Sequence, residues 1–123
     1  MTREETEQII HRMYEAFNSR DINSVDCIFT KGFYSHSLQA GLEAVKIAWA
    51  SMFERFPDIR VVVEDLLVDD DKAASRTSIR GITAADSEKQ PMILELIRVE
   101  NQRIAEVWGL TNLGEFARAK RKD

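Results

Sequence analysis

One carboxylate lies within a stretch that is otherwise largely apolar. Residues 92–99 read MILELIRV, a pattern typical of a β-strand. Side chains alternate between the two faces of a strand, so Glu95 shares its face with Ile93, Ile97 and Val99. Burial of a carboxylate among apolar side chains raises its pKa unless a partner offsets the cost. A carboxylate with a raised pKa is suited to accept a proton near neutral pH, which makes Glu95 a candidate general base.

Two other residues could take part in the same chemistry. Arg76 could orient a carboxylate or enolate oxygen of a substrate, and His36 could exchange protons near pH 7. Each of these residues, and Glu95 too, could instead have a purely structural role. Arg76 or Arg80, from a predicted strand over residues 73–83, could form a buried ion pair with Glu95, and His36 could simply line a cavity.

The elements that position these candidate residues are predicted to be helices followed by strands. Apolar residues at helical spacing predict a helix that begins after Thr2 and ends near Asn18, a short second helix capped by Asp21, and a third helix over residues 42–55. A short extended piece is expected at residues 33–36. Strands are expected over residues 59–68, 73–83, 92–99 and 103–110, the last two forming a hairpin around residues 100–102. Helices followed by antiparallel strands are typical of an α+β fold.

A bent sheet packed on helices has two different faces. The inner face can enclose a cavity with helical aromatic residues, whose spacing indicates core packing first and ligand contact second. The outer face carries apolar residues, and an exposed apolar surface usually marks an interface: Met92, Leu94, Leu96, Ile104 and Trp108. We therefore expect a homodimer that pairs through the outer sheet face, or packing of the C-terminal residues against this face.

Composition narrows the possible classes of protein. With 123 residues the chain is long enough for a single domain, residues 1–123. The net charge of −4 argues against unselective binding to nucleic acid or an anionic membrane. The single cysteine, Cys27, excludes an intrachain disulfide and a cysteine-based zinc cluster, and no metal site is expected. The sequence shows neither an apolar run of about 20 residues nor an apolar signal core at its start, so we expect a cytoplasmic protein.

Five segments together resemble one known family. They cover residues 14–21, 32–37, 41–46, 56–61 and 98–109, and in this order they are similar to the SnoaL-like polyketide cyclases of the nuclear transport factor 2-like superfamily. The resemblance implies an α+β, cone-shaped barrel in which three N-terminal helices pack on a strongly bent, mostly antiparallel sheet that encloses an apolar pocket. It also implies a dimer.

The resemblance further implies a chemistry. Cyclases of this family close a ring by an intramolecular aldol condensation, without a metal or a cofactor. Their base is an aspartate directly after a position often held by tryptophan. Aligned on Trp108, that position is occupied by Gly109, which has no side chain. A second ionisable position of the family falls at Glu95, while His36 and Arg76 match a histidine and an arginine common in it.

We therefore expect a cofactor-free enzyme that abstracts a proton from a small hydrophobic carbonyl compound, with Glu95, His36 and Arg76 as catalytic candidates. The expected ligand contacts are Tyr14, Trp49, Phe53, Ile93, Ile97, Val107, Gly109 and Asn112. Gly109 favours an alternative, a non-catalytic small-molecule-binding or dimeric interaction module of the same fold.

Overall fold

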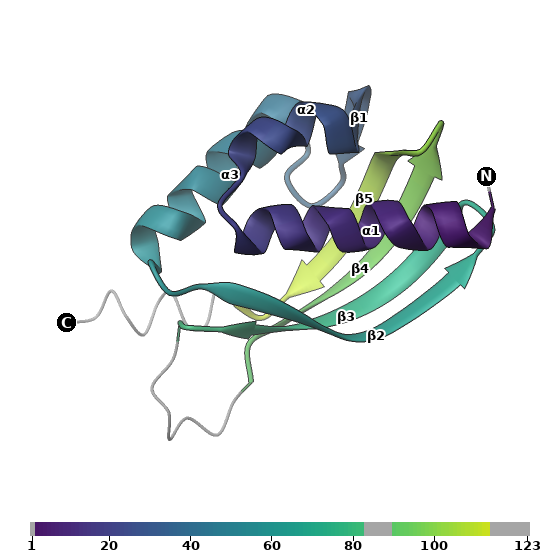
Figure 1. Cartoon of the computed structure of the whole chain (residues 1–123). Coiled ribbons are helices and arrows are strands. Elements are labelled where there is room, and N and C mark those ends of the chain that lie inside the picture. The colour runs from purple at the N-terminus through teal and green to yellow at the C-terminus, as the bar shows by residue number, and fades with distance from the viewer. Residues whose placement is uncertain (1, 83–89, 114–123) are drawn as a thin grey trace.

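The helices of the protein precede most of its strands, as Figure 1 shows. The computed structural model describes residues 2–82 and 90–113. Its elements, in chain order, are α1 (Arg3–Asn18), η1 (Ile22–Ser24), α2 (Val25–Ile28), β1 (Phe29–Ser35), α3 (Leu42–Arg55), β2 (Arg60–Asp69), β3 (Lys72–Arg80), β4 (Met92–Glu100) and β5 (Arg103–Thr111).

Helix α1 begins with a capping box. The Thr2 hydroxyl accepts a hydrogen bond from the Glu5 backbone N–H at 3.1 Å, and the Glu5 carboxylate accepts one from the Thr2 backbone N–H at 2.9 Å. These bonds satisfy backbone donors that a helix start otherwise leaves free. The helix then buries one apolar side, formed by Ile9, Ile10, Met13, Tyr14, Ala16 and Phe17. Helix α1 lies across the concave face of the sheet (Figure 1), and the predicted first helix is confirmed.

The five strands form one bent sheet in the order β1-β5-β4-β3-β2. β1 pairs with β5 in parallel, and the other neighbours are antiparallel. The predicted α+β fold with three helices on a bent, mostly antiparallel sheet is confirmed. The sheet is not closed into a barrel, because β1 and β2 remain its two edges.

The predicted hairpin between β4 and β5 is also present. Asn101 and Gln102 have positive φ angles of 50° and 62°, and Glu100 pairs with Arg103 on either side of them. Two successive residues with positive φ define a type I′ turn, whose twist matches that of the flanking strands. The loop is therefore one residue shorter than the three-residue break predicted from polarity.

Two predicted boundaries are wrong. The second helix divides into η1 and α2 and ends at Ile28, so that Phe29 begins a strand that is longer than the predicted piece at 33–36. β3 ends at Arg80 and not at residue 83, because Gly81 has a φ of 85° that interrupts the strand. A side chain at Gly81 would also collide with the Asp58 carbonyl oxygen, 2.1 Å from the Cβ position.

A β-bulge changes the face on which Ile104 lies. Arg98 pairs with Glu106, but its neighbour Val99 pairs with Ile104, which leaves Ala105 as an extra residue in β5. The alternation shifts at this point, and Ile104 is fully buried on the helix side. The assignment of Ile104 to the outer face is therefore incorrect.

The hydrophobic core lies between the helices and the concave face. Its completely buried members come from both layers and include Ile10, Ile28, Ile59, Ile97 and Ile104. None of the helices in the described part of the chain is both long and apolar enough to cross a membrane.

Candidate functional site

Glu95 lies in the middle of the concave face, opposite helix α1. Across the sheet it pairs with Ser75 on β3 and with Gly109 on β5. Its carboxylate oxygen Oε1 accepts a hydrogen bond of 2.7 Å from the hydroxyl of Tyr14 on α1. The alternation along β4 therefore directs the carboxylate toward the helices, and α1 supplies its hydrogen-bond donor.

Burial determines the proton affinities of this pair. Removal from water raises the pKa of Glu95, and the hydrogen bond from Tyr14 offsets part of the effect. Burial, together with the neighbouring charge of Glu95, raises the pKa of Tyr14 far above its usual value. Tyr14 therefore remains protonated and acts as a donor at any pH near neutrality.

Ser75 completes a chain of hydrogen bonds. Its hydroxyl lies 2.8 Å from the Tyr14 hydroxyl and is buried. Tyr14 has one hydroxyl proton, and that proton is directed at Glu95. Ser75 must then donate to Tyr14, so the bonds run from Ser75 through Tyr14 to Glu95.

Two cavities on the helix side of the sheet meet at Glu95. The deep chamber has a volume of about 130 Å³ and is lined on its own side by Tyr14, Phe17, Ile59, Val61, Thr77 and Ile79. The mouth chamber has a volume of about 200 Å³ and is lined by apolar residues of β1 and α3 and by the hydroxyls of Ser35, Ser37 and Thr111. The two chambers share the same dividing residues: Met13, Trp49, Met52, Ile93 and Glu95.

Glu95 is the only carboxylate among the described residues that line either chamber. Its second oxygen, Oε2, receives no hydrogen bond from a described residue, whereas Oε1 is held by Tyr14. A carboxylate with one oxygen fixed and one available, in apolar surroundings, is arranged to accept a proton from a bound molecule.

The structure brings several predicted contact residues to these chambers and leaves others outside them. Tyr14, Trp49 and Ile93 line the deep chamber, and Val107 and Gly109 line the mouth chamber.

Arg76 does not reach the site, contrary to the prediction. It pairs with Leu94 across the strands and lies on the outer face, where its guanidinium forms an ion pair of 2.7 Å with Asp65. Arg80 is exposed and lies on the same face of β3. Since the side chains of Ser75 and Glu95 point inward, neither arginine pairs with Glu95, and the predicted buried ion pair is absent among the described residues.

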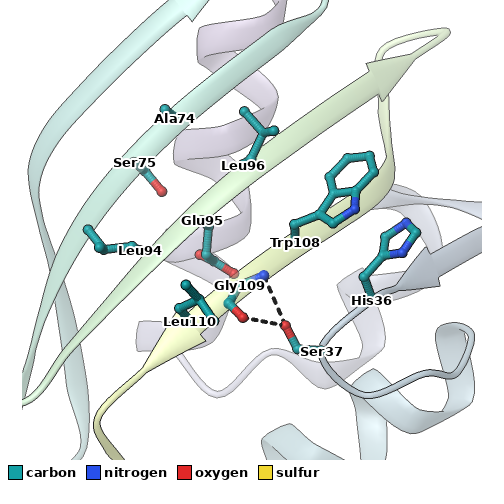
Figure 2. A pocket seen from close by; sticks show the side chains of 10 residues that line it. All are labelled: His36, Ser37, Ala74, Ser75, Leu94, Glu95, Leu96, Trp108, Gly109 and Leu110. Atoms are coloured by element: carbon teal, nitrogen blue, oxygen red, sulfur yellow. Dashed lines mark hydrogen bonds between the residues drawn. The ribbon is translucent and has the colours of Figure 1, made fainter.

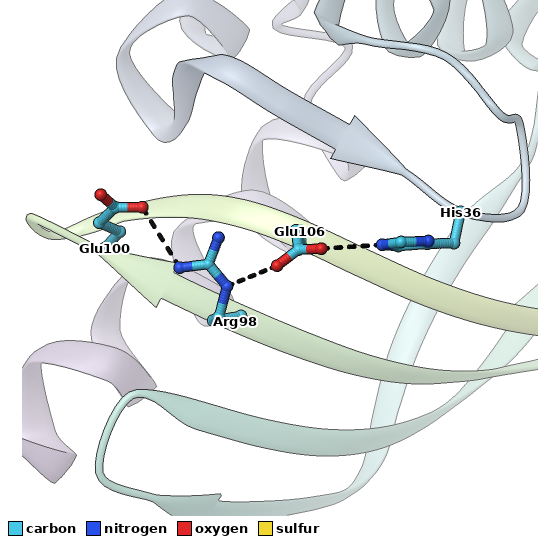
Figure 3. A network of polar contacts seen from close by, with 4 residues as sticks. All are labelled: His36, Arg98, Glu100 and Glu106. Carbon is cyan, nitrogen blue, oxygen red and sulfur yellow. Dashed lines mark hydrogen bonds and ion pairs between the residues drawn. The ribbon is translucent and has the colours of Figure 1, made fainter.

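His36 also lies outside both chambers. Figure 2 shows its ring beside that of Trp108, and the two are stacked at 4.3 Å with 7° between their planes. His36 Nε2 is 2.8 Å from Glu106, which is also bound by Arg98, as Figure 3 shows. The preceding residue, Ser35, points into the mouth chamber, so His36 points to the outer face, and its predicted position in the cavity is incorrect.

Three further predicted contacts have structural roles. Phe53 packs against Phe17 at 4.9 Å between ring centroids, and Ile97 is completely buried in the core. The Asn112 side chain accepts from the Met92 backbone N–H at 2.9 Å and donates to the Gln90 carbonyl at 3.1 Å. None of these three lines either chamber, so their prediction as ligand contacts is corrected.

Ser37 is a site residue that the sequence did not reveal. Its hydroxyl accepts from the Gly109 N–H at 2.9 Å and donates to the Gly109 carbonyl at 2.7 Å (Figure 2). A Cβ at position 109 would lie 3.2 Å from this hydroxyl oxygen and 3.6 Å from Cγ of Glu95. A side chain on residue 109 would therefore enter the immediate surroundings of Glu95. Glu95 is near Gly109 because β4 pairs with β5, whereas only the pairing of β1 with β5 brings Ser37 to this position.

Known structures share this arrangement of helices and strands. Two putative polyketide cyclases superpose with a TM-score of 0.80: one from Bacillus cereus ATCC 10987, with 24% identity over 93% of this chain and 78% of its own, and IdmH from Streptomyces antibioticus, with 21% identity over 92% and 96%. TsrD from Streptomyces laurentii superposes with a TM-score of 0.77 and 20% identity over 96% of both chains. Likeness at these identities shows the fold alone.

None of the curated proteins matches the sequence significantly. The family model of the SnoaL-like polyketide cyclases matches residues 7–119, which is most of the chain. The protein therefore belongs to the SnoaL-like polyketide cyclase family.

Proposed function

We propose that this protein is a cofactor-free enzyme that removes a proton from a carbon next to a carbonyl group in a small hydrophobic compound. Loss of that proton gives an enolate, which is the common intermediate of aldol ring closure and of isomerisation. The observation that carries the proposal is the position of Glu95, a single carboxylate between two apolar chambers.

Glu95 has the properties that a base in this reaction needs. Its raised pKa makes the carboxylate a stronger proton acceptor than an exposed glutamate. Tyr14 fixes Oε1 at 2.7 Å, which leaves Oε2 to face the substrate carbon. Apolar walls exclude water, which strengthens electrostatic interactions within the site.

A second candidate function is binding without a reaction. The family's aspartate position is occupied here by Gly109, and this glycine favours a small-molecule-binding module of the same fold. The two candidates differ in one respect that can be measured, namely whether a bound carbonyl compound loses a proton.

We also propose that two copies of the chain pair through the outer face of the sheet. Leu94, Leu96, Trp108 and Leu110 are between 38% and 76% exposed there, and they border a groove of about 640 Å³ (Figure 2). Exposure of this many large apolar side chains on one surface supports an interface.

The test of catalysis is deuterium exchange at an acidic carbon. Ethyl 3-oxobutanoate carries a methylene between two carbonyl groups, and NMR in D₂O follows the replacement of its protons. The wild-type protein should accelerate this exchange, and Glu95→Gln should reduce the acceleration by at least about 100-fold, the usual contribution of a general base. Glu106→Gln is the matched control, because this glutamate lies on the outer face, and it should leave the rate unchanged.

Exchange that continues at the wild-type rate in Glu95→Gln would contradict the role of Glu95. Binding of the ester by the wild-type protein without any acceleration would favour the non-catalytic candidate.

A further inference from the structure

The two chambers at Glu95 differ in access and polarity. The deep chamber is lined mainly by buried residues, such as Ile59 and Ile79, which are 1% and 3% exposed. The mouth chamber includes exposed residues, among them Ser37 and Leu38. The mouth chamber is therefore the more accessible of the two, and Glu95 lies between it and the deep chamber.

Side chains at the boundary can give way to a ligand. Met13 and Met52 line both chambers, on the side of the helices. Methionine is unbranched and adapts its shape to its neighbours more readily than other apolar residues. A narrow, flexible arm of a ligand can pass between them, which places the adjoining part of that ligand against Glu95.

The deep chamber suits an apolar group and not a polar one. Its hydroxyls are already engaged: Tyr14 donates to Glu95, and Thr77 donates to the Ile93 carbonyl at 3.4 Å. Beyond Glu95, a polar group that entered would find no free donor among these hydroxyls, and the loss of its hydrogen bonds to water is costly. With about 30 Å³ for a water-sized group, the volume of about 130 Å³ holds roughly four heavy atoms.

We propose that the substrate is an elongated molecule with a short alkyl arm that occupies the deep chamber. Its reacting carbon lies beside Glu95 at the junction, and its remaining part, which carries the more polar groups, lies in the mouth chamber. The identity of the reacting carbon rests on the proposed function, whereas the seating of the arm rests on the shape of the chambers.

The probe for this arrangement is a series of ethyl 3-oxoalkanoates whose alkyl arm grows from methyl to heptyl. Calorimetric titration measures the dissociation constant of each ester with the full-length wild-type protein. Affinity should increase by up to about fourfold for each added methylene while the arm fills the chamber, the factor that corresponds to burial of one methylene. It should stop increasing at an arm of roughly four carbons, when the volume is full.

Two variants at Val61 test which chamber sets this limit. Val61 lines only the deep chamber. Val61→Leu reduces the volume of the deep chamber. The arm length at which affinity stops increasing should then become about one carbon shorter. Val61→Ala enlarges the chamber and should make this arm length about one carbon longer, a gain that a misfolded protein does not show.

Ala48→Leu is the matched control, because Ala48 lines only the mouth chamber. It should change the affinity of all the esters by a similar factor and leave the limiting arm length unchanged. A limit that stays the same in both Val61 variants, or that moves with Ala48→Leu, would overturn the proposal.

The outcome is separate from that of the catalytic test. An arm-length limit that responds to Val61, in a protein that does not accelerate exchange, would support the seating of the arm and reject the proposed reaction. Accelerated exchange without any dependence of affinity on arm length would support the proposed reaction and reject the seating of the arm.

Discussion

At the scale of single residues, Glu95 makes the stability of the protein depend on pH. Its pKa is raised by burial above the ordinary value of 4.5. Between the unfolded and the folded pKa the folded state therefore binds more protons than the unfolded state, and stability decreases as pH rises through the folded value. The full stability of the site is present only below about pH 4.5.

Glu95→Gln should remove this dependence. The glutamine oxygen can still accept from Tyr14 but never becomes charged. We expect the variant to be close to the wild type in stability at pH 4 and more stable than it at pH 8, by about 1.4 kcal/mol for each unit of the pKa shift. Urea unfolding at a series of pH values measures the difference.

Glu106→Gln provides the opposite control. His36 and Arg98 lower the pKa of Glu106, so that this carboxylate stabilises the folded state above its unfolded pKa and loses the effect as pH falls. Glu106→Gln should be less stable than the wild type at neutral pH and equal to it in acid. A constant difference between wild type and Glu95→Gln across the pH range would refute the assignment of a raised pKa.

Much of the site at this scale was accessible from the sequence. The inward direction of Glu95 follows from simple alternation along β4. Arg76 and His36 were misplaced because family likeness assigned them a role, whereas a side chain's face depends on the register of its own strand. Ser75 and Tyr14 were not linked to each other, because 61 residues separate them and only the packing of α1 on β3 brings them together.

At the scale of elements, a side chain extends the pairing of β1 with β5. The backbone pairing ends at Ser35 and Val107, followed by a bond from the His36 N–H to the Val107 carbonyl. Beyond it, the Ser37 hydroxyl bonds both polar groups of Gly109. This hydroxyl therefore holds the end of β5 that borders the mouth chamber.

Ser37→Ala should loosen this end of β5 locally. Loss of the two bonds should cost about 1 kcal/mol of unfolding free energy. Native-state hydrogen exchange should show faster exchange of the Gly109 amide. The Val99 amide, which bonds the Asp71 carbonyl at 2.8 Å, serves as the internal control and should keep its protection. Equal changes at both amides would indicate general destabilisation in place of a local role.

The elements themselves were predicted well where local patterns determine them. Thr2 and apolar spacing indicated α1, apolar spacing indicated α3, and the polar break indicated the hairpin. Bulges left no comparable signal. The extra residue, Ala105, is not of a type that marks a bulge, and its effect on Ile104 arises from the pairing of β5 with β4.

At the scale of the whole molecule, the outer sheet face should determine the oligomeric state. Leu96 is 45% exposed near the centre of this face. Leu96→Arg places a charge there, and burial of that charge without a partner would be costly. Analytical ultracentrifugation should show a dimer for the wild type and a monomer for this variant.

Ile47→Arg is the control for that experiment. Ile47 is 70% exposed on α3, away from the outer sheet face, and its substitution should leave the dimer intact. A wild-type protein that sediments as a monomer, or a dimer that Leu96→Arg does not affect, would reject this interface.

The chain of hydrogen bonds from Ser75 through Tyr14 to Glu95 reaches only one of the two carboxylate oxygens. A proton that arrived on Oε2 would leave Oε1 able to accept from Tyr14 as before. The polarity of the chain is therefore the same for a charged and a neutral Glu95, and a change of charge at this residue requires no rearrangement of α1 or β3.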